Sequence, residues 1–157
     1  MRAQAHYANP ETETYESATG AFGATTATKT YIGPKGRKGL VRDIEIFLTA
    51  DCVGTTAVPE VDVGTASGDF TYARWRLGTS PTVGITAAAT PQRARSLATQ
   101  QDISVPGTPR PALADFPGHV ALESALIPAD TPFVITMKQG TGTPAGTGTS
   151  RVTIDWF

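Results

Sequence analysis

The chain has 157 residues, of which 17% are charged, and its formal net charge is −1. This length predicts one domain with a sizeable core, and the charge balance argues against direct binding of nucleic acid. The single cysteine, Cys52, excludes an intrachain disulfide framework, and no apolar run is long enough to span a membrane.

Small residues dominate the composition, since Thr, Ala, Gly and Pro together make up 75 of the 157 residues. Gly and Pro interrupt helices, and Thr favours strands and turns. The composition therefore predicts an all-β protein with many loops.

The first 28 residues show neither a helical nor a strand period, and the segment is small, polar and interrupted by Gly. It carries three widely spaced aromatic residues, Tyr7, Tyr15 and Phe22. Because aromatic side chains gain most from docking, we predict that residues 1–28 form an extended N-terminal arm that orders against a partner through these three residues. A floppy terminus is the alternative.

Alternation of apolar and polar residues predicts the main strands that follow the arm. These strands cover residues 29–32, 39–49, 58–64, 70–77, 132–139 and 151–157. In the longest of them, one face is expected to carry the core residues and consists of Leu40, Arg42, Ile44, Ile46 and Leu48.

Residues 78–118 are predicted to form a long irregular insertion rich in Pro and Gly. Within it, a short helix could begin at Thr90, and QDISV at 101–105 could form a short strand. Residues 119–127 are expected to form a strand rather than a helix, since Pro117 and Gly118 precede them. The total is about eight strands in a domain over residues 29–157, which suits a β-sandwich of jelly-roll type.

The last two predicted strands, 132–139 and 151–157, are separated by the Gly-rich segment GTGTPAGTGTS. Two alternating runs around such a segment favour an antiparallel hairpin with a long, mobile tip. Shortening this tip is then expected to leave the stability unchanged.

No catalytic, cofactor-binding or metal-binding constellation is predicted from the sequence. His6, Cys52 and His119 lie far apart in the chain, whereas structural zinc sites use closely spaced ligand pairs. Carboxylates spaced two apart, such as Glu60 and Asp62, are interpreted as a solvated sheet face. The segment GPKGRKG lacks the Ser or Thr of a phosphate-binding loop. We therefore expect a protein that is not an enzyme and needs no cofactor.

Charge is segregated along the chain. Residues 29–42 hold five cations and no anion, and we predict that Lys35, Arg37, Lys38 and Arg42 contact an acidic protein partner. Six anions follow within residues 43–69, and five arginines lie within residues 74–110. These blocks fit either complementary surfaces for neighbouring molecules or ion pairs between strands of the same chain.

The segment YIGPKGRKGLVRDIEIFLTADCVGTTAVPEVDVGTASGDFTYA and the closing ALIPADTPFVITMKQGTGTPAGTGTSRVTIDWF resemble the capsid decoration, or cement, proteins of tailed bacteriophages. The resemblance covers residues 31–77 and 119–157. It implies a jelly-roll-like core, no catalytic residues and a place on the outer capsid surface of the virion. It also implies self-association, often as a homotrimer, and the major capsid protein as the partner at junctions between capsomers.

A carbohydrate- or receptor-binding β-sandwich of a phage fibre or tail is the alternative function. In that case Tyr72, Trp75 and Trp156 would be the aromatic platforms on which sugar rings stack, although Trp75 and Trp156 are expected to face inward with the core residues of their strands.

Overall fold

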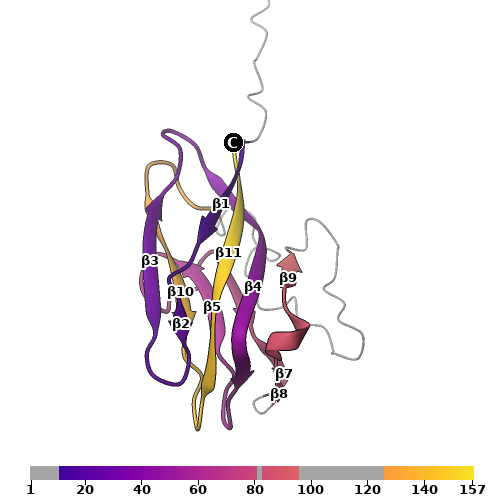
Figure 1. Cartoon of the computed structure of the whole chain (residues 1–157). Coiled ribbons are helices and arrows are strands. Elements are labelled where there is room, and N and C mark those ends of the chain that lie inside the picture. The colour runs from indigo at the N-terminus through magenta and orange to yellow at the C-terminus, as the bar shows by residue number, and fades with distance from the viewer. Residues whose placement is uncertain (1–10, 81–82, 96–125) are drawn as a thin grey trace, which may run out of the picture.

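The computed structural model describes residues 11–80, 83–95 and 126–157, and these form a β-sandwich of two antiparallel sheets (Figure 1). In chain order the elements are β1 (Glu11–Glu16), β2 (Gly20–Ala21), β3 (Ala27–Ile32), β4 (Gly39–Val53), β5 (Glu60–Gly64), β6 (Ala73–Arg76), β7 (Gly78–Ser80), β8 (Val83–Gly84), the short 3₁₀ helix η1 (Ala87–Ala89), β9 (Gln92–Arg95), β10 (Pro132–Lys138) and β11 (Ala145–Trp156). The all-β sandwich is confirmed, whereas the jelly-roll type stays a prediction.

Each sheet has two edge strands. The first sheet has the order β1-β11-β4-β9, with β2 also paired to β11, and the second has the order β3-β10-β5-β6. Strands β7 and β8 form a small separate ribbon. The edge strands β1 and β3 lie on the same side of the sandwich (Figure 1).

The longest pairing joins β4 to β11 over nearly their whole length. Strand β4 has 15 residues and β11 has 12, and three register shifts absorb the difference. One shift leaves Arg42 without a partner on β11, since Asp43 pairs with Thr153 and Val41 with Ile154. This bulge changes which side chains face inward. The predicted core face of residues 39–49 is therefore wrong at its start, where Val41 is buried and Arg42 is exposed.

The hydrophobic core lies between the two sheets and contains the residues that alternation places inward elsewhere. Predicted inward residues that are fully or nearly fully buried are Ile44, Ile46, Val61, Val63, Ala73, Trp75, Leu77, Phe133, Ile135, Met137, Val152, Ile154 and Trp156. At one end of the core the rings of Tyr15, Phe133 and Trp156 lie edge-on or tilted against each other, with centroids 5.0–6.3 Å apart. Period-two patterning thus predicts most of the core.

The described part of the predicted N-terminal arm belongs to the sandwich. Strand β1 pairs with β11 along all six of its residues, and Phe22 is completely buried in the core. The prediction of an arm is therefore wrong for residues 11–28, and residues 1–10 lie outside the described residues. The sequence ETETYE looks unstructured because its outward positions are polar and only Tyr15 carries an apolar ring inward.

The region after β6 also differs from the prediction. Residues 92–95 form strand β9 on the edge of β4, where a helix beginning at Thr90 was expected. Thr90 instead follows η1, and its hydroxyl donates to the carbonyl of Ala87 at 2.7 Å. The predicted strand at 101–105 and most of the predicted strand at 119–127 lie outside the described residues. From that last segment, Ile127 is buried and pairs with Gly39.

Strands β10 and β11 do not form a hairpin, because they belong to different sheets. The second half of the Gly-rich segment, from Ala145 onward, extends β11 and pairs with both β2 and β4. Gly148 is buried, and a Cβ atom there would lie 2.3 Å from the carbonyl oxygen of Phe47. The small residues of this segment therefore allow close strand packing, and the predicted mobile tip is wrong for residues 145–150.

We predict that Gly148→Ala lowers the free energy of unfolding by about 1–3 kcal/mol, because the added methyl group has to displace the backbone of β4. Thermal denaturation followed by circular dichroism measures the effect. Thr143→Ala is the matched control, since Thr143 is exposed in the preceding loop and is expected to leave the melting temperature unchanged. Equal melting temperatures for the two variants would contradict the strand assignment.

Candidate functional site

A connected group of charged side chains lies on β5, β6 and β10. Arg74 donates from Nε to Oδ1 of Asp62 at 2.7 Å and from Nη2 to Oδ2 at 3.0 Å. Glu60 accepts from Arg76 at 3.2 Å and from Lys138 at 3.0 Å. Asp62 is 0% exposed and Glu60 is 8% exposed. The prediction that these two carboxylates form a solvated sheet face is therefore wrong.

The loop between β5 and β6 covers this charged group. The Gly68 N–H donates to the hydroxyl of Thr136 at 3.1 Å, and Thr136 lies beside Asp62 in the register of β10 and β5. The Phe70 ring lies 3.5 Å from the guanidinium carbon of Arg74. Burial raises the pKa of the Asp62 carboxyl above its usual value, and the two hydrogen bonds from Arg74 offset only part of that rise.

Asp69 holds the covering loop in shape. Its carboxylate accepts hydrogen bonds from the backbone and hydroxyl groups of both Thr65 and Thr71. Partial burial acts to raise the pKa of Asp69, but these hydrogen bonds outweigh burial and lower it. Because the loop closes over Asp62 and Arg74, we assign the buried charges a structural role.

Opposite charges from separate sequence blocks pair across neighbouring strands. Besides the contacts on β5 and β6, Arg93 on β9 donates to Glu45 on β4 at 2.9 Å. Of the two interpretations of the charge blocks, ion pairing between strands of the same chain therefore holds for these residues. The pairing leaves fewer charges for a partner than the sequence blocks suggest.

Cys52 is a core residue. It is 1% exposed, and burial, aided by the charge of Asp51, raises the pKa of its thiol to about 12. Such a thiol stays protonated at neutral pH and is a poor nucleophile. Among the described residues, no group of three or more His, Cys, Asp or Glu side chains is placed to hold a metal ion. His6 and His119 lie outside the described residues.

The turn at residues 33–38, which carries Lys35, Arg37 and Lys38 and which we call the basic turn, connects β3 to β4. Gly36 has a φ of +73° there, which favours glycine, and its N–H donates to Oδ1 of Asp130 at 2.9 Å. The side chains of Lys35 and Lys38 are exposed, and neither forms an ion pair with a described residue. Two of the four predicted contact cations are thus exposed without an ion-pair partner among the described residues.

The other two predicted contact cations are engaged within the chain. Nη1 of Arg37 lies 3.6 Å from the carboxylate of Glu11, and Nη1 of Arg42 lies 3.5 Å from that of Asp155. Both pairs remain partly exposed, so each contributes about 0–1 kcal/mol to stability. Arg37 thus joins the basic turn to β1, and Arg42 joins β4 to β11.

Two exposed apolar side chains lie at the two ends of this turn. Ile32, at the end of β3, is 59% exposed, and Phe157 is 50% exposed. Lys38 and Phe157 exchange two backbone hydrogen bonds of 3.0 Å, which holds Phe157 beside the turn. We call the surface formed by Ile32, Lys35, Lys38 and Phe157 the basic end; it lies at the end of the sandwich marked C in Figure 1.

The predicted aromatic contact residues do not form a common surface. Phe22 is completely buried, and Tyr15 packs inward with its ring centroid 5.0 Å from those of Tyr31 and Phe133. Tyr7 lies outside the described residues. The prediction that Phe22 contacts a partner is wrong, because the core of its own chain surrounds it.

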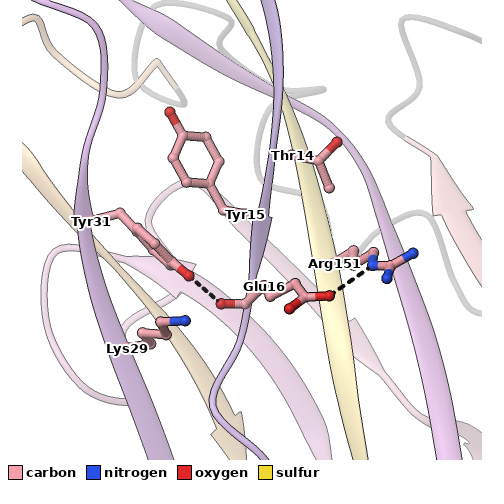
Figure 2. Close-up of a pocket in the computed structure, with 6 residues that line it drawn as sticks. All are labelled: Thr14, Tyr15, Glu16, Lys29, Tyr31 and Arg151. Carbon is pink, nitrogen blue, oxygen red and sulfur yellow. Dashed lines mark hydrogen bonds and ion pairs between the residues drawn. The ribbon is translucent and has the colours of Figure 1, made fainter.

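A shallow pocket of about 590 Å³ opens on the side where β1 and β3 are the sheet edges (Figure 2). Its lining residues are Thr14, Tyr15, Glu16, Lys29, Tyr31 and Arg151. The Tyr31 hydroxyl donates to the backbone carbonyl of Glu16 at 2.5 Å and so bridges the two edges. Nε of Arg151 donates to the Glu16 carboxylate at 3.1 Å.

Sequence reasoning missed this pocket, which we call the open-side pocket, because its residues come from three separate strands. The segment ATKTYI alternates in a way that places Ala27, Lys29 and Tyr31 on one face of β3. That alternation is visible in the sequence. The position of β3 at a sheet edge opposite β1 is not.

No protein-family model, curated sequence or solved structure matches this chain. Within the described residues, no helix has the length and apolar character needed to cross a membrane.

We predict that Arg74→Met lowers the free energy of unfolding by about 3–5 kcal/mol, because it leaves the buried Asp62 carboxylate without its bidentate partner. Arg93→Met is the matched control. It also removes an arginine that pairs with a carboxylate on the neighbouring strand, but its side chain is 45% exposed, so about 0–1 kcal/mol is expected. Urea denaturation measures both values, and similar losses would show that burial does not set the strength of the pair.

Proposed function

We propose that this chain is a structural virion protein that decorates the outer surface of a bacteriophage capsid and binds the major capsid protein at junctions between capsomers. The observation that carries the proposal is the basic end, which combines two exposed lysines with two exposed apolar side chains. The sequence resemblance over residues 31–77 and 119–157 supports the same function. Self-association is part of the proposal, and the resemblance implies a homotrimer.

The composition of the basic end suits protein docking. Ile32 and Phe157 offer apolar area that a partner can cover, and Lys35 and Lys38 offer charge at the margin of that area. Marginal charges steer association and set its dependence on salt, whereas buried apolar contacts hold the complex together. An acidic, partly apolar surface on the capsid protein is the complementary partner. This role requires no catalytic chemistry of the chain.

We predict that Lys35→Glu combined with Lys38→Glu weakens binding to purified capsids, most strongly at low salt, because the acidic partner surface then repels the turn. Sedimentation with capsids at several salt concentrations measures the effect. Arg93→Glu is the control, since it changes the charge of an exposed residue on β9, away from the basic end.

The expected slope of capsid affinity against salt concentration is flatter for the lysine variant than for the unchanged protein. Binding that is equal for both proteins across the whole salt titration would contradict docking through the basic end.

The alternative function, binding of a carbohydrate or receptor by a fibre or tail module, is favoured by the open-side pocket. Tyr15 and Tyr31 there combine aromatic rings with the polar groups of Glu16, Lys29 and Arg151. The residues first expected to stack on sugars do not serve this purpose, since Tyr72, Trp75 and Trp156 are all at most 5% exposed. Tyr31 therefore replaces them as the candidate.

For this alternative, we predict that the isolated protein binds members of a glycan array and that Tyr31→Ala removes the binding, whereas the Lys35→Glu, Lys38→Glu variant keeps it. A chain that binds capsids but no glycan on the array contradicts the alternative.

A further inference from the structure

The side of the sandwich formed by β1 and β3 presents unpaired strand edges. Within the described chain, β1 pairs only with β11, and β3 pairs only with β10. The Ser17 N–H donates to the Ser150 carbonyl, so the backbone groups of Ser17 face β11. Successive residues of a strand point their N–H and C=O groups to opposite sides, and the backbone groups of Thr12, Thr14 and Glu16 therefore face away from β11. The Glu16 carbonyl accepts from Tyr31, in agreement with that direction, and the backbone groups of Thr14 face the open side.

The inward face of β1 carries Glu11, which pairs with Arg37, and Glu13, and the inward face of β3 carries Lys29. Glu13 shares the inward face of β1 with Tyr15, whose hydroxyl donates to the Glu13 carboxylate. Lys29 shares the inward face of β3 with Tyr31, and its Nζ lies 5.2 Å from the centroid of that ring (Figure 2). Neither Glu13 nor Lys29 forms an ion pair with a described residue. The open side therefore holds one acid and one base that do not pair with each other.

We propose that this open side is the contact surface for a second copy of the same chain, with β1 of each copy paired to β3 of the other. Strands β1 and β4 run in the same direction, since both are antiparallel to β11. The turn at residues 33–38 reverses the chain between β3 and β4, so β3 runs opposite to β1 (Figure 1). A two-fold axis parallel to the strands then brings β1 beside β3 of the second copy in antiparallel orientation.

The two-fold arrangement satisfies both edges at once. The spacing between β1 and β3 is the same in each copy, so both sheets continue across the contact. Glu13 of one copy then lies on the same inner face as Lys29 of the other, and the pair occurs twice because the contact is symmetric. Glu13 and Lys29 thus find in a second copy the ion-pair partners that they lack among the described residues of one chain.

Charge selects this pairing over the other edge combinations. Pairing β1 with β1 would bring Glu13 near a second Glu13, and pairing β3 with β3 would bring two Lys29 side chains together, so both are disfavoured. Both edges lie on one side of the molecule, so the contact closes with two copies. The inference therefore differs from the homotrimer implied by the resemblance, and it does not depend on capsid binding through the basic end.

Sedimentation equilibrium at micromolar concentration tests the proposal. We expect the unchanged protein to sediment at twice the monomer mass of 16.4 kDa. Glu13→Lys and Lys29→Glu are each expected to weaken the dimer roughly tenfold or more, since each replaces two attractive contacts by two repulsive ones. An equimolar mixture of the two variants is expected to form a dimer again, because a mixed dimer pairs the lysine introduced on β1 of one copy with the glutamate introduced on β3 of the other. The second contact of that dimer keeps its original Glu13 and Lys29.

Substitutions at Thr14 and Lys35 test the backbone pairing of this contact and its independence from the basic end. Thr14→Pro removes a backbone N–H that faces the open side and is expected to abolish the dimer while circular dichroism stays unchanged, whereas Thr14→Val is expected to keep the dimer. Lys35→Glu changes the basic end and is also expected to keep it, which distinguishes this proposal from capsid docking. A monomeric or trimeric unchanged protein, or a variant mixture that stays monomeric, would overturn the inference.

Discussion

The pairing of β4 with β11 is the constraint on which the rest of the structure depends. It joins the two longest strands, and every other strand of the first sheet pairs with one of these two. Its three register shifts determine which residues of β4 face the second sheet. Because a shift of one residue moves side chains to the opposite face, the core depends on these bulges as much as on the alternation of residue types.

Alternation predicts the strands that lie well inside the sheets, and it fails where a contact distant in sequence decides the structure. Residues 132–139 and 151–157 are predictable as strands with the correct inward faces, yet their assignment to different sheets is not encoded in their own pattern. The bulge at Arg42 depends likewise on the partner strand. Strand β1 escapes prediction because an edge strand needs only one apolar side chain, Tyr15, on its inward face.

The candidate surfaces are predictable only in part, because sequence shows which residues are charged but not which charges already have partners. Lys35 and Lys38 remain exposed as expected, while Arg37 and Arg42 pair with Glu11 and Asp155. Asp62 was expected in solvent and is completely buried, since Arg74 and the loop after β5 enclose it. Predicting the open-side pocket would require knowing which strand forms the edge of each sheet on that side.

The position of β11 has a consequence for the order of events during synthesis. Strand β11 lies between β1 and β4, although both of its neighbours precede it by about 100 residues or more. The first sheet therefore cannot assemble until residues 145–156 have left the ribosome. Until then, the edges of β1 and β4 that pair with β11 are exposed. Such a chain folds late and as a unit, so any intermediate that accumulates before β11 docks presents β4, the longest of the described strands, to other chains.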